Sequence, residues 1–163
     1  MRQTVIGVMG PGVGAREIDR TVAAQLGGEI AREGWILLTG GRNVGVMEAA
    51  SQGAKQAGGL TVGILPTASS EGISEAVDIA IFTDLGSARN NINVLSSDAI
   101  VACGIGAGTA SEVALALKAK KPVVLLNCDR TSEAFFETLS SGSLWIARTV
   151  EEAISMVKHR LHF

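Results

Sequence analysis

The segment DAIVACGIGAGTASEVALAL, residues 98–117, decides the fold of this chain. Residues 99–103 are apolar, residues 104–108 read GIGAG, and an alanine- and leucine-rich stretch follows up to Lys118. An apolar run, a glycine turn and an aliphatic stretch in this order predict a buried strand, a tight turn and a helix. The glycines let the backbone bend sharply and let a ligand approach it closely.

The turn after this strand is a candidate anion site. The first turn of a helix has free N–H groups and a partial positive charge, and both favour an anion. We therefore expect a phosphate-like group near Gly106, Gly108 and Thr109. Thr109 and Glu112 also match a capping box, with Thr109 as the N-cap and Glu112 as its reciprocal partner. In that alternative both residues are structural.

The composition is that of one globular domain over residues 1–163, since 47% of the residues are hydrophobic and 18% are charged. The formal net charge of −2 does not favour nucleic acid binding, and no apolar run is long enough to span a bilayer. The N-terminus lacks the layout of a signal peptide. Cys103 and Cys128 form neither a CxxC pair nor a zinc pattern, so we expect a reduced, cytoplasmic protein. Cys103, at the end of a strand, is interpreted as a buried structural cysteine.

The pattern of strand, glycine loop and helix also occurs twice in the first third of the chain. A strand over residues 4–9 is followed by Gly10-Pro11-Gly12-Val13-Gly14 and a helix. A strand over 35–38 is followed by TGGRNVG, residues 39–45, and another helix. Arg42 lies in this second loop, at the carboxyl end of a strand, where open α/β sheets bind their ligands. We interpret Arg42 as a ligand contact, with a solvated loop arginine as the alternative.

A loop with one arginine and three asparagines follows the fourth predicted strand. Strands are expected over 60–65 and 77–82, and residues 83–93 read TDLGSARNNIN before a helix that ends near Ser97. Asparagine offers both donors and acceptors to the edge of a heterocycle. Arg89 is suited to clamp a phosphate with two hydrogen bonds. In the alternative, serine and asparagine only cap the helix and form the turn.

The remaining elements complete an alternation of strands and helices. Strands are expected over 122–127 and 144–147, a helix over 131–140, and a last helix from Thr149 to the end. The inward residues of the helix over 131–140 would be Phe135, Phe136 and Leu139. The alternation predicts an α/β fold with a single doubly wound, mostly parallel sheet and helices on both faces. The loops after the first, second, fourth and fifth strands should meet at one edge.

Several common chemistries do not fit these motifs. The loops at Gly10 and Gly104 read GxGxG rather than the GxGxxG of dinucleotide-binding enzymes, and the second strand ends without an acidic residue. No lysine of the Walker type follows a glycine loop. His159 and His162 lie at the extreme C-terminus, so neither a Ser-His-Asp order nor a metal cluster is visible.

Three segments of the chain resemble the molybdenum cofactor carrier proteins. They are GWILLTGGRNVGVMEAA (34–50), LGSARNNINVLSSDAIVACGIGAGTASE (85–112) and EVALALKAKKPVVLL (112–126). These carriers belong to a wider group that is similar to the lysine decarboxylase-like phosphoribohydrolases, which release cytokinin bases. The resemblance extends from Ile6 to about Leu126.

The resemblance implies a Rossmann-like fold, a homo-oligomer that is a dimer or a tetramer, and a pocket for a phosphorylated pterin that chelates molybdenum through a dithiolene. It implies that the protein binds and protects this molybdenum cofactor (Moco) for storage or transfer to apo-enzymes, and does not turn it over. The phosphate and oxo-metal ends would lie at helix N-termini and at Arg42 or Arg89. Asparagines would contact the pterin edge, and no side chain would bind the metal directly.

The motifs and the resemblance together predict a cofactor-binding site at the carboxyl edge of the sheet. Its ligand would be a small anion with a flat heterocycle, and molybdoenzyme apo-proteins are the expected protein partners. The predicted site residues are Gly10, Pro11, Gly12, Thr39, Gly40, Gly41, Arg42, Gly45, Ser87, Arg89, Asn90, Asn93, Gly104, Gly106, Ala107, Gly108, Thr109 and Glu112.

A nucleoside 5′-monophosphate phosphoribohydrolase is the alternative function. Enzymes of that group carry a proline-glycine-glycine-x-glycine-threonine-x-x-glutamate signature and an arginine–lysine pair. This pattern is matched by Thr109, Glu112 and Arg89. In such an enzyme Glu112 would stabilise positive charge on the ribose, and Arg89 would hold the nucleotide. The chain departs from the pattern at the proline, the first glycine and the lysine, which are here Gly104, Ile105 and Asn90. These departures favour the non-catalytic carrier.

Overall fold

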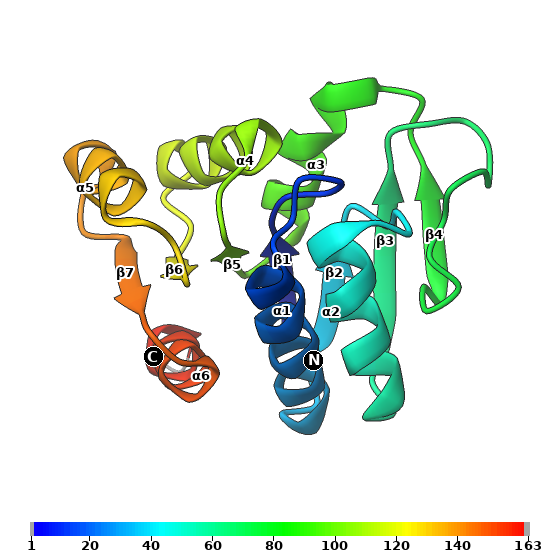
Figure 1. The fold of residues 1–163 in the computed structure, drawn as a ribbon, viewed down its shortest axis with the longest axis horizontal. Helices are drawn as coiled ribbons and strands as arrows, with labels where there is room; N and C mark the ends of the chain where they lie inside the picture. The colour runs from blue at the N-terminus through cyan, green and yellow to red at the C-terminus, as the bar shows by residue number, and fades with distance from the viewer. Residues whose placement is uncertain (1, 162–163) are drawn as a thin grey trace.

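Within residues 2–161, the part of the chain that the computed structural model describes, seven short parallel strands form one sheet (Figure 1). They are β1 (Val5–Met9), β2 (Ile36–Thr39), β3 (Thr61–Leu65), β4 (Ile79–Phe82), β5 (Ala99–Cys103), β6 (Val123–Leu126) and β7 (Leu144–Ala147). The central strands are apolar at nearly every position because helices cover both faces of the sheet.

The order of the strands reverses once, at the middle of the sheet. The strands lie in the order β4-β3-β2-β1-β5-β6-β7, so the chain winds outward from β1 to β4 and then returns to the other side of β1. β1 pairs with β5 from Ile6 opposite Ala99 to Met9 opposite Ala102. In doubly wound sheets the loops on either side of such a point leave a crevice at the carboxyl ends of the strands. The predicted α/β fold class, with a doubly wound parallel sheet, is confirmed.

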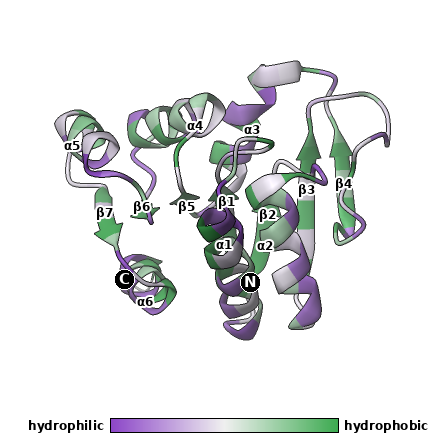
Figure 2. Ribbon diagram, viewed as in Figure 1, coloured by the Kyte–Doolittle hydropathy of each residue, from purple (hydrophilic) through white to green (hydrophobic). Residues whose placement is uncertain are grey.

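Six α-helices of the described chain pack on the sheet, three on each face. They are α1 (Glu17–Arg32), α2 (Gly45–Gln56), α3 (Arg89–Ser96), α4 (Ala107–Lys118), α5 (Arg130–Leu139) and α6 (Val150–Leu161), and a single 3-10 turn, η1 (Gly86–Ala88), precedes α3. Apolar side chains under α1, α2 and α6 form one core cluster, and those under α3, α4 and α5 form the second. In Figure 2 the strands are mainly hydrophobic and hydrophilic residues gather on the outer helices. None of these helices is both long and apolar enough to cross a bilayer.

Two helices begin earlier than the sequence predicted. The predicted loop over residues 83–93 is wrong at its end, because α3 begins at Arg89 and places the asparagines on a helix. α4 begins at Ala107, with Gly106 as its N-cap, and the Gly106 carbonyl accepts the N–H of Ala110 at 2.8 Å. Thr109 is therefore the third residue of the helix, and the predicted capping box is wrong. A glycine in an extended conformation starts this helix without any side-chain cap.

The predicted inner face of α5 is only partly correct. Phe136 is buried, but Phe135 and Leu139 are 58% and 49% exposed. Phe135 and Leu139 are four residues apart and therefore share one side of the helix. α5 buries only a narrow stripe against the sheet, and the side with Phe135 and Leu139 points away from the sheet.

The start of the last helix agrees with the sequence in its N-cap, Thr149. The N–H of Glu152 donates to Thr149 Oγ1 at 3.2 Å, and Glu152 Oε2 accepts the N–H of Arg148 at 2.7 Å. Thr149 therefore caps the helix as predicted, but the return hydrogen bond of Glu152 goes to Arg148, one residue before the N-cap, and not to Thr149 as in a regular capping box. α6 is described to Leu161, and His162 lies outside the described residues.

Helices α1 and α2 touch backbone to backbone. A Cβ atom on Gly27 would lie 2.1 Å from the carbonyl oxygen of Ala50, and one on Gly53 would lie 2.0 Å from the carbonyl oxygen of Ala24. Only glycine allows so close an approach. α1 follows β1 and α2 follows β2, so this contact holds the two glycine loops that precede these helices side by side.

Replacing Gly27 by Ala should lower the free energy of unfolding by about 1–3 kcal/mol, because the added methyl group forces the two helix backbones apart. The neighbouring Gly28→Ala is the matched control: its Cβ would have its nearest neighbour at 3.5 Å, so the stiffer chain should gain about 0.4–1 kcal/mol. Urea-induced unfolding followed by circular dichroism measures both. Equal effects of the two substitutions would contradict the backbone contact.

Candidate functional site

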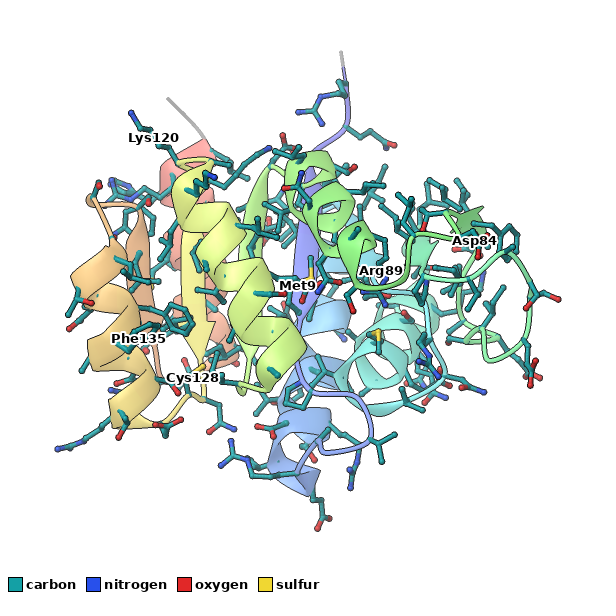
Figure 3. The ribbon with its side chains drawn as sticks, turned by 90° about the horizontal axis from the view of Figure 1, so that it is seen from above. Met9, Asp84, Arg89, Lys120, Cys128 and Phe135 are labelled. Atoms are coloured by element: carbon teal, nitrogen blue, oxygen red, sulfur yellow. The ribbon has the colours of Figure 1, made fainter. Side chains whose placement is uncertain are left out.

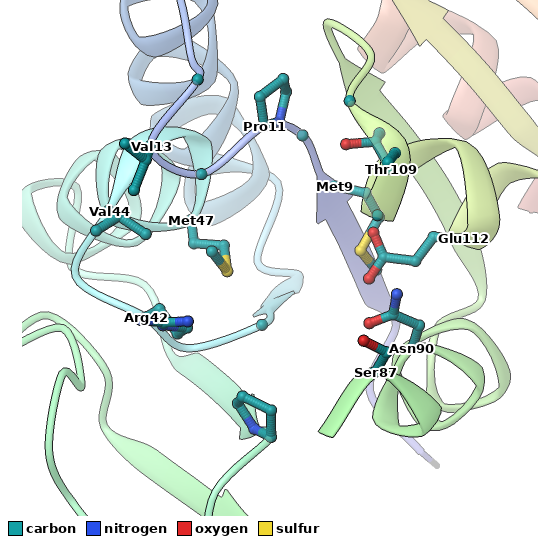
Figure 4. Close-up of a pocket in the computed structure, with 18 of the residues that line it drawn as sticks. Met9, Pro11, Val13, Arg42, Val44, Met47, Ser87, Asn90, Thr109 and Glu112 are labelled. Atoms are coloured by element: carbon teal, nitrogen blue, oxygen red, sulfur yellow. The ribbon is translucent and has the colours of Figure 1, made fainter. Parts of the chain in front are cut away.

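A cavity of about 550 Å³ opens at the carboxyl edge of the sheet (Figure 4). Its walls come from the loops after β1, β2, β3, β4 and β5 and from the first turns of α3 and α4. The prediction that the loops after the first, second, fourth and fifth strands meet is confirmed, and Pro66 adds the loop after the third. Pockets for small molecules commonly have volumes of about 300–1,000 Å³.

Most of the predicted site residues line this cavity. They are Gly10, Pro11, Gly12, Gly40, Arg42, Ser87, Arg89, Asn90, Gly106, Ala107, Gly108, Thr109 and Glu112. Their positions support the predicted site, and their contacts with a ligand stay a prediction. The sequence analysis missed a second set of lining residues, which includes Val13, Gly14, Val44 and Met47.

Five predicted residues support the wall from behind instead of lining it. They are Thr39, Gly41, Gly45, Asn93 and Gly104. Thr39 Oγ1 accepts the N–H of Gly41 at 3.0 Å and lies 3.4 Å from Ser51 Oγ. Gly41 has a φ of +77°, and a Cβ there would lie 2.8 Å from the side chain of Leu65. These two residues therefore shape the second loop and do not face the cavity.

The first and second glycine loops are joined directly. Gly45 has a φ of +56°, and a Cβ there would lie 2.1 Å from the carbonyl oxygen of Gly12 and 2.3 Å from that of Pro11. The N–H of Val46 donates to the Pro11 carbonyl at 3.0 Å. Gly45 is thus required because the backbone of the first loop occupies the space of its side chain.

Asp19, in the first turn of α1, ties the first loop to the loops after β5 and β6. It is 1% exposed and accepts hydrogen bonds from Arg16 Nη2 at 2.7 Å and from Asn127 Nδ2 at 3.2 Å. Burial raises the pKa of Asp19, but the hydrogen bonds from Arg16 and Asn127 outweigh it and hold the pKa below its ordinary value. Gly104 has a φ of +71°, and a Cβ there would lie 2.7 Å from Asp19 Oδ1. One buried carboxylate therefore bonds to the loops after β1 and β6 and packs against the loop after β5.

Five side chains that are at most 9% exposed form the deep part of the cavity, which we call the pocket floor: Met9, Arg89, Asn90, Thr109 and Glu112. Arg89 Nη1 donates to Asn90 Oδ1 at 2.8 Å and lies 3.9 Å from Glu112 Oε1. Arg89 Nη2 reaches the Gly40 carbonyl at 3.5 Å. Asn93 Nδ2 donates to Glu112 Oε1 at 2.9 Å. Figure 3 shows Met9 and Arg89 close together near the middle of the molecule.

The exposed side of the cavity, which we call the pocket rim, carries a cation and apolar side chains: Pro11, Val13, Arg42 and Val44. The backbone of Arg42 is held by a bridge to Ile73, but within residues 2–161 its exposed side chain forms no hydrogen bond or ion pair. Val13 is 92% exposed and lies beside Val44, opposite Glu112 (Figure 4). The sequence feature that could have identified Val13 as a lining residue is its place between two glycines of the first loop.

The charges around the cavity leave it net positive. Burial lowers the pKa of Arg89. The charge of Glu112 raises the pKa of Arg89, and the charge of Arg42 lowers it. Burial raises the pKa of Glu112, against the hydrogen bond from Asn93 and the charge of Arg89. Two guanidinium groups therefore accompany one carboxylate, and the cavity favours an anionic ligand.

The two cysteines do not contribute a nucleophile. Both thiols are free and buried. Burial raises the pKa of Cys103 far above its ordinary value and that of Cys128 to about 12, so both stay protonated near neutral pH. The burial predicted for Cys103 is confirmed. The described chain also lacks any group of three or more side chains arranged to hold a metal ion.

Known proteins share this fold and most of this sequence. Residues 3–154 match the model of the SLOG cluster4 family. The structure is similar to that of the molybdenum cofactor binding protein from the phototrophic bacterium Rippkaea orientalis, with a TM-score of 0.97 and 61% identity over 99% of both chains. It is also similar to the molybdenum cofactor carrier protein from Chlamydomonas reinhardtii, with a TM-score of 0.95 and 56% identity over 99% of this chain and 100% of that one.

An enzyme of the wider group is a more distant relative. The cytokinin riboside 5′-monophosphate phosphoribohydrolase of Mycobacterium tuberculosis is 36% identical over 94 residues, which are 56% of this chain and 50% of the enzyme. The carrier proteins match almost the full length at higher identity. The chain therefore belongs to the SLOG cluster4 family and groups with the molybdenum cofactor carrier proteins.

Proposed function

We propose that the protein binds the molybdenum cofactor, a phosphorylated pterin with molybdenum on its dithiolene, and holds it for storage or transfer without turning it over. The observation that carries this proposal is the net positive cavity at the carboxyl ends of β1 and β5, in a chain 61% identical to a molybdenum cofactor binding protein. The cofactor is anionic at its phosphate and its oxo-metal end, which matches the charge of the cavity.

Donors for the anionic end lie at the pocket rim and at the exposed start of α4. Arg42 is exposed there and is not neutralised by an ion pair within the described chain. The first intrahelical hydrogen bond of α4 runs from Ala110 to Gly106, so the N–H groups of Ala107 and Gly108 have no intrahelical partner. A phosphate or molybdenum-bound oxygen is the kind of acceptor that such groups bind.

The pocket floor supports a ligand as well. Arg89 Nε and Thr109 Oγ1 are buried without a hydrogen-bond partner within the described chain. Buried polar groups in native proteins are nearly always paired. Neither atom is accessible from the cavity in this structure, so a polar ligand would supply these partners only together with a shift of the two side chains.

Phosphoribohydrolase activity is the second candidate, because the structure brings Arg89 to within 3.9 Å of Glu112. Gly104 argues against it. Its φ is +71° and its N–H donates to the Leu126 carbonyl at 3.2 Å, whereas the proline of the hydrolase signature has no N–H and a fixed negative φ. The turn that would carry the signature is therefore built differently in this chain, which favours the carrier.

We also propose that the protein is a homo-oligomer in which a second copy covers β4. Ile79 and Ile81 are 47% and 45% exposed on this edge strand. They pair in register with Val62 and Ile64, which belong to the core under α3, α4 and α5. An apolar sheet face thus continues beyond the helices that cover it, and such exposed surface is typical of an interface.

Molybdoenzyme apo-proteins are the partners that we propose for release of the cofactor, and the cytoplasm is the compartment. The two free thiols, Cys103 and Cys128, suit a reducing environment.

Arg42→Ala should weaken retention of the cofactor about 10- to 100-fold, because a charge-assisted hydrogen bond contributes about 1.5–3 kcal/mol. Arg89→Ala should weaken retention too, since it removes positive charge from the cavity. The measurement is anaerobic: each protein is mixed with freshly released molybdenum cofactor and passed through gel filtration, and molybdenum and pterin fluorescence are assayed in the protein peak.

Arg32→Ala is the control for surface charge. Arg32 lies at the far end of α1, away from the cavity. The Arg32→Ala protein should therefore retain the cofactor as the unchanged protein does. Unaltered retention in both the Arg42 and the Arg89 variants would rule out the anion site.

Incubation with adenosine monophosphate should release no free adenine above the buffer blank, because the turn at Gly104 does not have the conformation that a proline requires. Chromatographic separation of adenine from the nucleotide provides the readout. Adenine release that disappears in Glu112→Ala would instead identify a hydrolase, and the carrier proposal would be wrong.

Ile81→Glu should convert the oligomer to a monomer, since a charge in the centre of an apolar interface is costly to bury. Gel filtration with light scattering gives the mass of each species. Phe135→Glu, at an exposed apolar position on α5, is the control and should leave the mass unchanged. An Ile81→Glu protein with the mass of the unchanged protein would refute β4 as the interface.

A further inference from the structure

The exposed side of the cavity offers hydrogen-bond donors, and the pocket floor adds a charged acceptor. Its exposed side offers donors, namely Arg42 at the rim and the N–H groups at the start of α4 that have no intrahelical partner. Its floor offers a carboxylate, Glu112, which is 6% exposed and lies beside Arg89. A ligand with an anionic end and a donor-rich end would match both regions.

Glu112 keeps acceptor capacity that the protein does not use. Its Oε1 accepts one hydrogen bond, from Asn93, while Arg89 Nη1 at 3.9 Å is too far for another. Its Oε2 accepts none within the described chain and, unlike Asn93 Oδ1, is not sealed off from the cavity. A carboxylate offers about four acceptor positions, so most of those on Glu112 remain available to a ligand.

Helix capping does not account for this buried carboxylate. α4 begins at Ala107, so Glu112 does not close a capping box at Thr109. A buried charge with one hydrogen bond and only a long ion pair, here to Arg89 at 3.9 Å, is costly, and an apolar residue would pack there at lower cost. Buried ionisable groups that face a cavity are typical of functional sites.

The pterin of the proposed ligand has an edge that fits this arrangement. Its 2-amino group and its N3–H are adjacent donors, and O4 beside them is an acceptor. A carboxylate accepts two parallel N–H groups with its two oxygens, as it does from arginine. We propose that Glu112 binds the 2-amino and N3–H donors of the pterin while Arg89 donates to O4. This inference rests on the proposed cofactor-binding function.

The orientation of the ligand follows from this pairing. The ring enters the pocket floor first, and the phosphate and molybdenum lie at the rim beside Arg42. The reverse orientation would place an anion against Glu112 in a buried setting, where like charges repel strongly. It would also leave the exposed cation at the rim facing the neutral ring.

A comparison of two uncharged pteridines tests the role of Glu112. Pterin has the donor–donor edge, whereas in lumazine an oxo group replaces the 2-amino group and leaves N3–H between two carbonyls. Fluorescence titration gives the affinity of each probe without phosphate or metal. The unchanged protein should bind pterin at least about tenfold more tightly than lumazine, because lumazine leaves the buried carboxylate without one of its donors.

Three variants separate recognition from folding. Glu112→Gln should weaken pterin binding at least about tenfold and should leave lumazine binding unchanged, so that the preference disappears. Glu112→Asp keeps the charge and should keep the preference at lower affinity. Glu133→Gln is the matched control, since Glu133 is equally buried but pairs with Arg148 outside the cavity. It should leave both affinities unchanged, and thermal unfolding checks that each variant is folded.

Equal affinities of the unchanged protein for the two pteridines, binding of neither at millimolar concentration, or a preference that survives Glu112→Gln would overturn the inference. The gel-filtration assay of cofactor retention, run in parallel, keeps the two proposals apart. If the unchanged protein retains the cofactor but does not prefer pterin, only the role of Glu112 fails. If it does not retain the cofactor, the proposed function fails.

Discussion

The backbone contact between α1 and α2 is the constraint on which the site depends. Gly27 and Gly53 let these helices approach to a distance that no side chain would allow. Each helix directly follows a glycine loop, so the contact extends to the loops, where the carbonyls of Pro11 and Gly12 occupy the space beside Gly45. One wall of the cavity is therefore closely packed backbone, which holds its shape better than flexible side chains would.

Two buried carboxylates near the site have different roles, and their hydrogen bonds distinguish them. Asp19 is fully engaged by Arg16 and Asn127, and it joins three loops. Glu112 is almost as deeply buried but accepts a single hydrogen bond, and it faces the cavity. A buried charge whose hydrogen bonds are all made within the protein specifies structure. A buried carboxylate with few hydrogen bonds beside a cavity is available to a ligand.

The relation to the phosphoribohydrolases illustrates that one fold can hold different functions. Arg89 and Glu112 stand at the positions of the hydrolase residues and meet in the cavity. The turn before α4 nevertheless depends on Gly104, whose positive φ and N–H donor exclude proline, and Asp19 fills the space where a side chain would start. The departures of this chain from the hydrolase pattern lie in this turn and at Asn90 on α3, and not in the sheet.

The sequence by itself determined the α/β alternation, the buried strands and the edge at which the loops meet, because hydrophobic periods and glycine turns are local signals. It also identified most of the residues that line the cavity, Arg42 and Arg89 among them. Only the tertiary structure decided that Gly45 supports the wall while Gly12 lines it, that α4 begins before Thr109, and that Val13 stands at the rim. Those outcomes depend on which distant backbone fills the space beside each residue, and no local pattern encodes that.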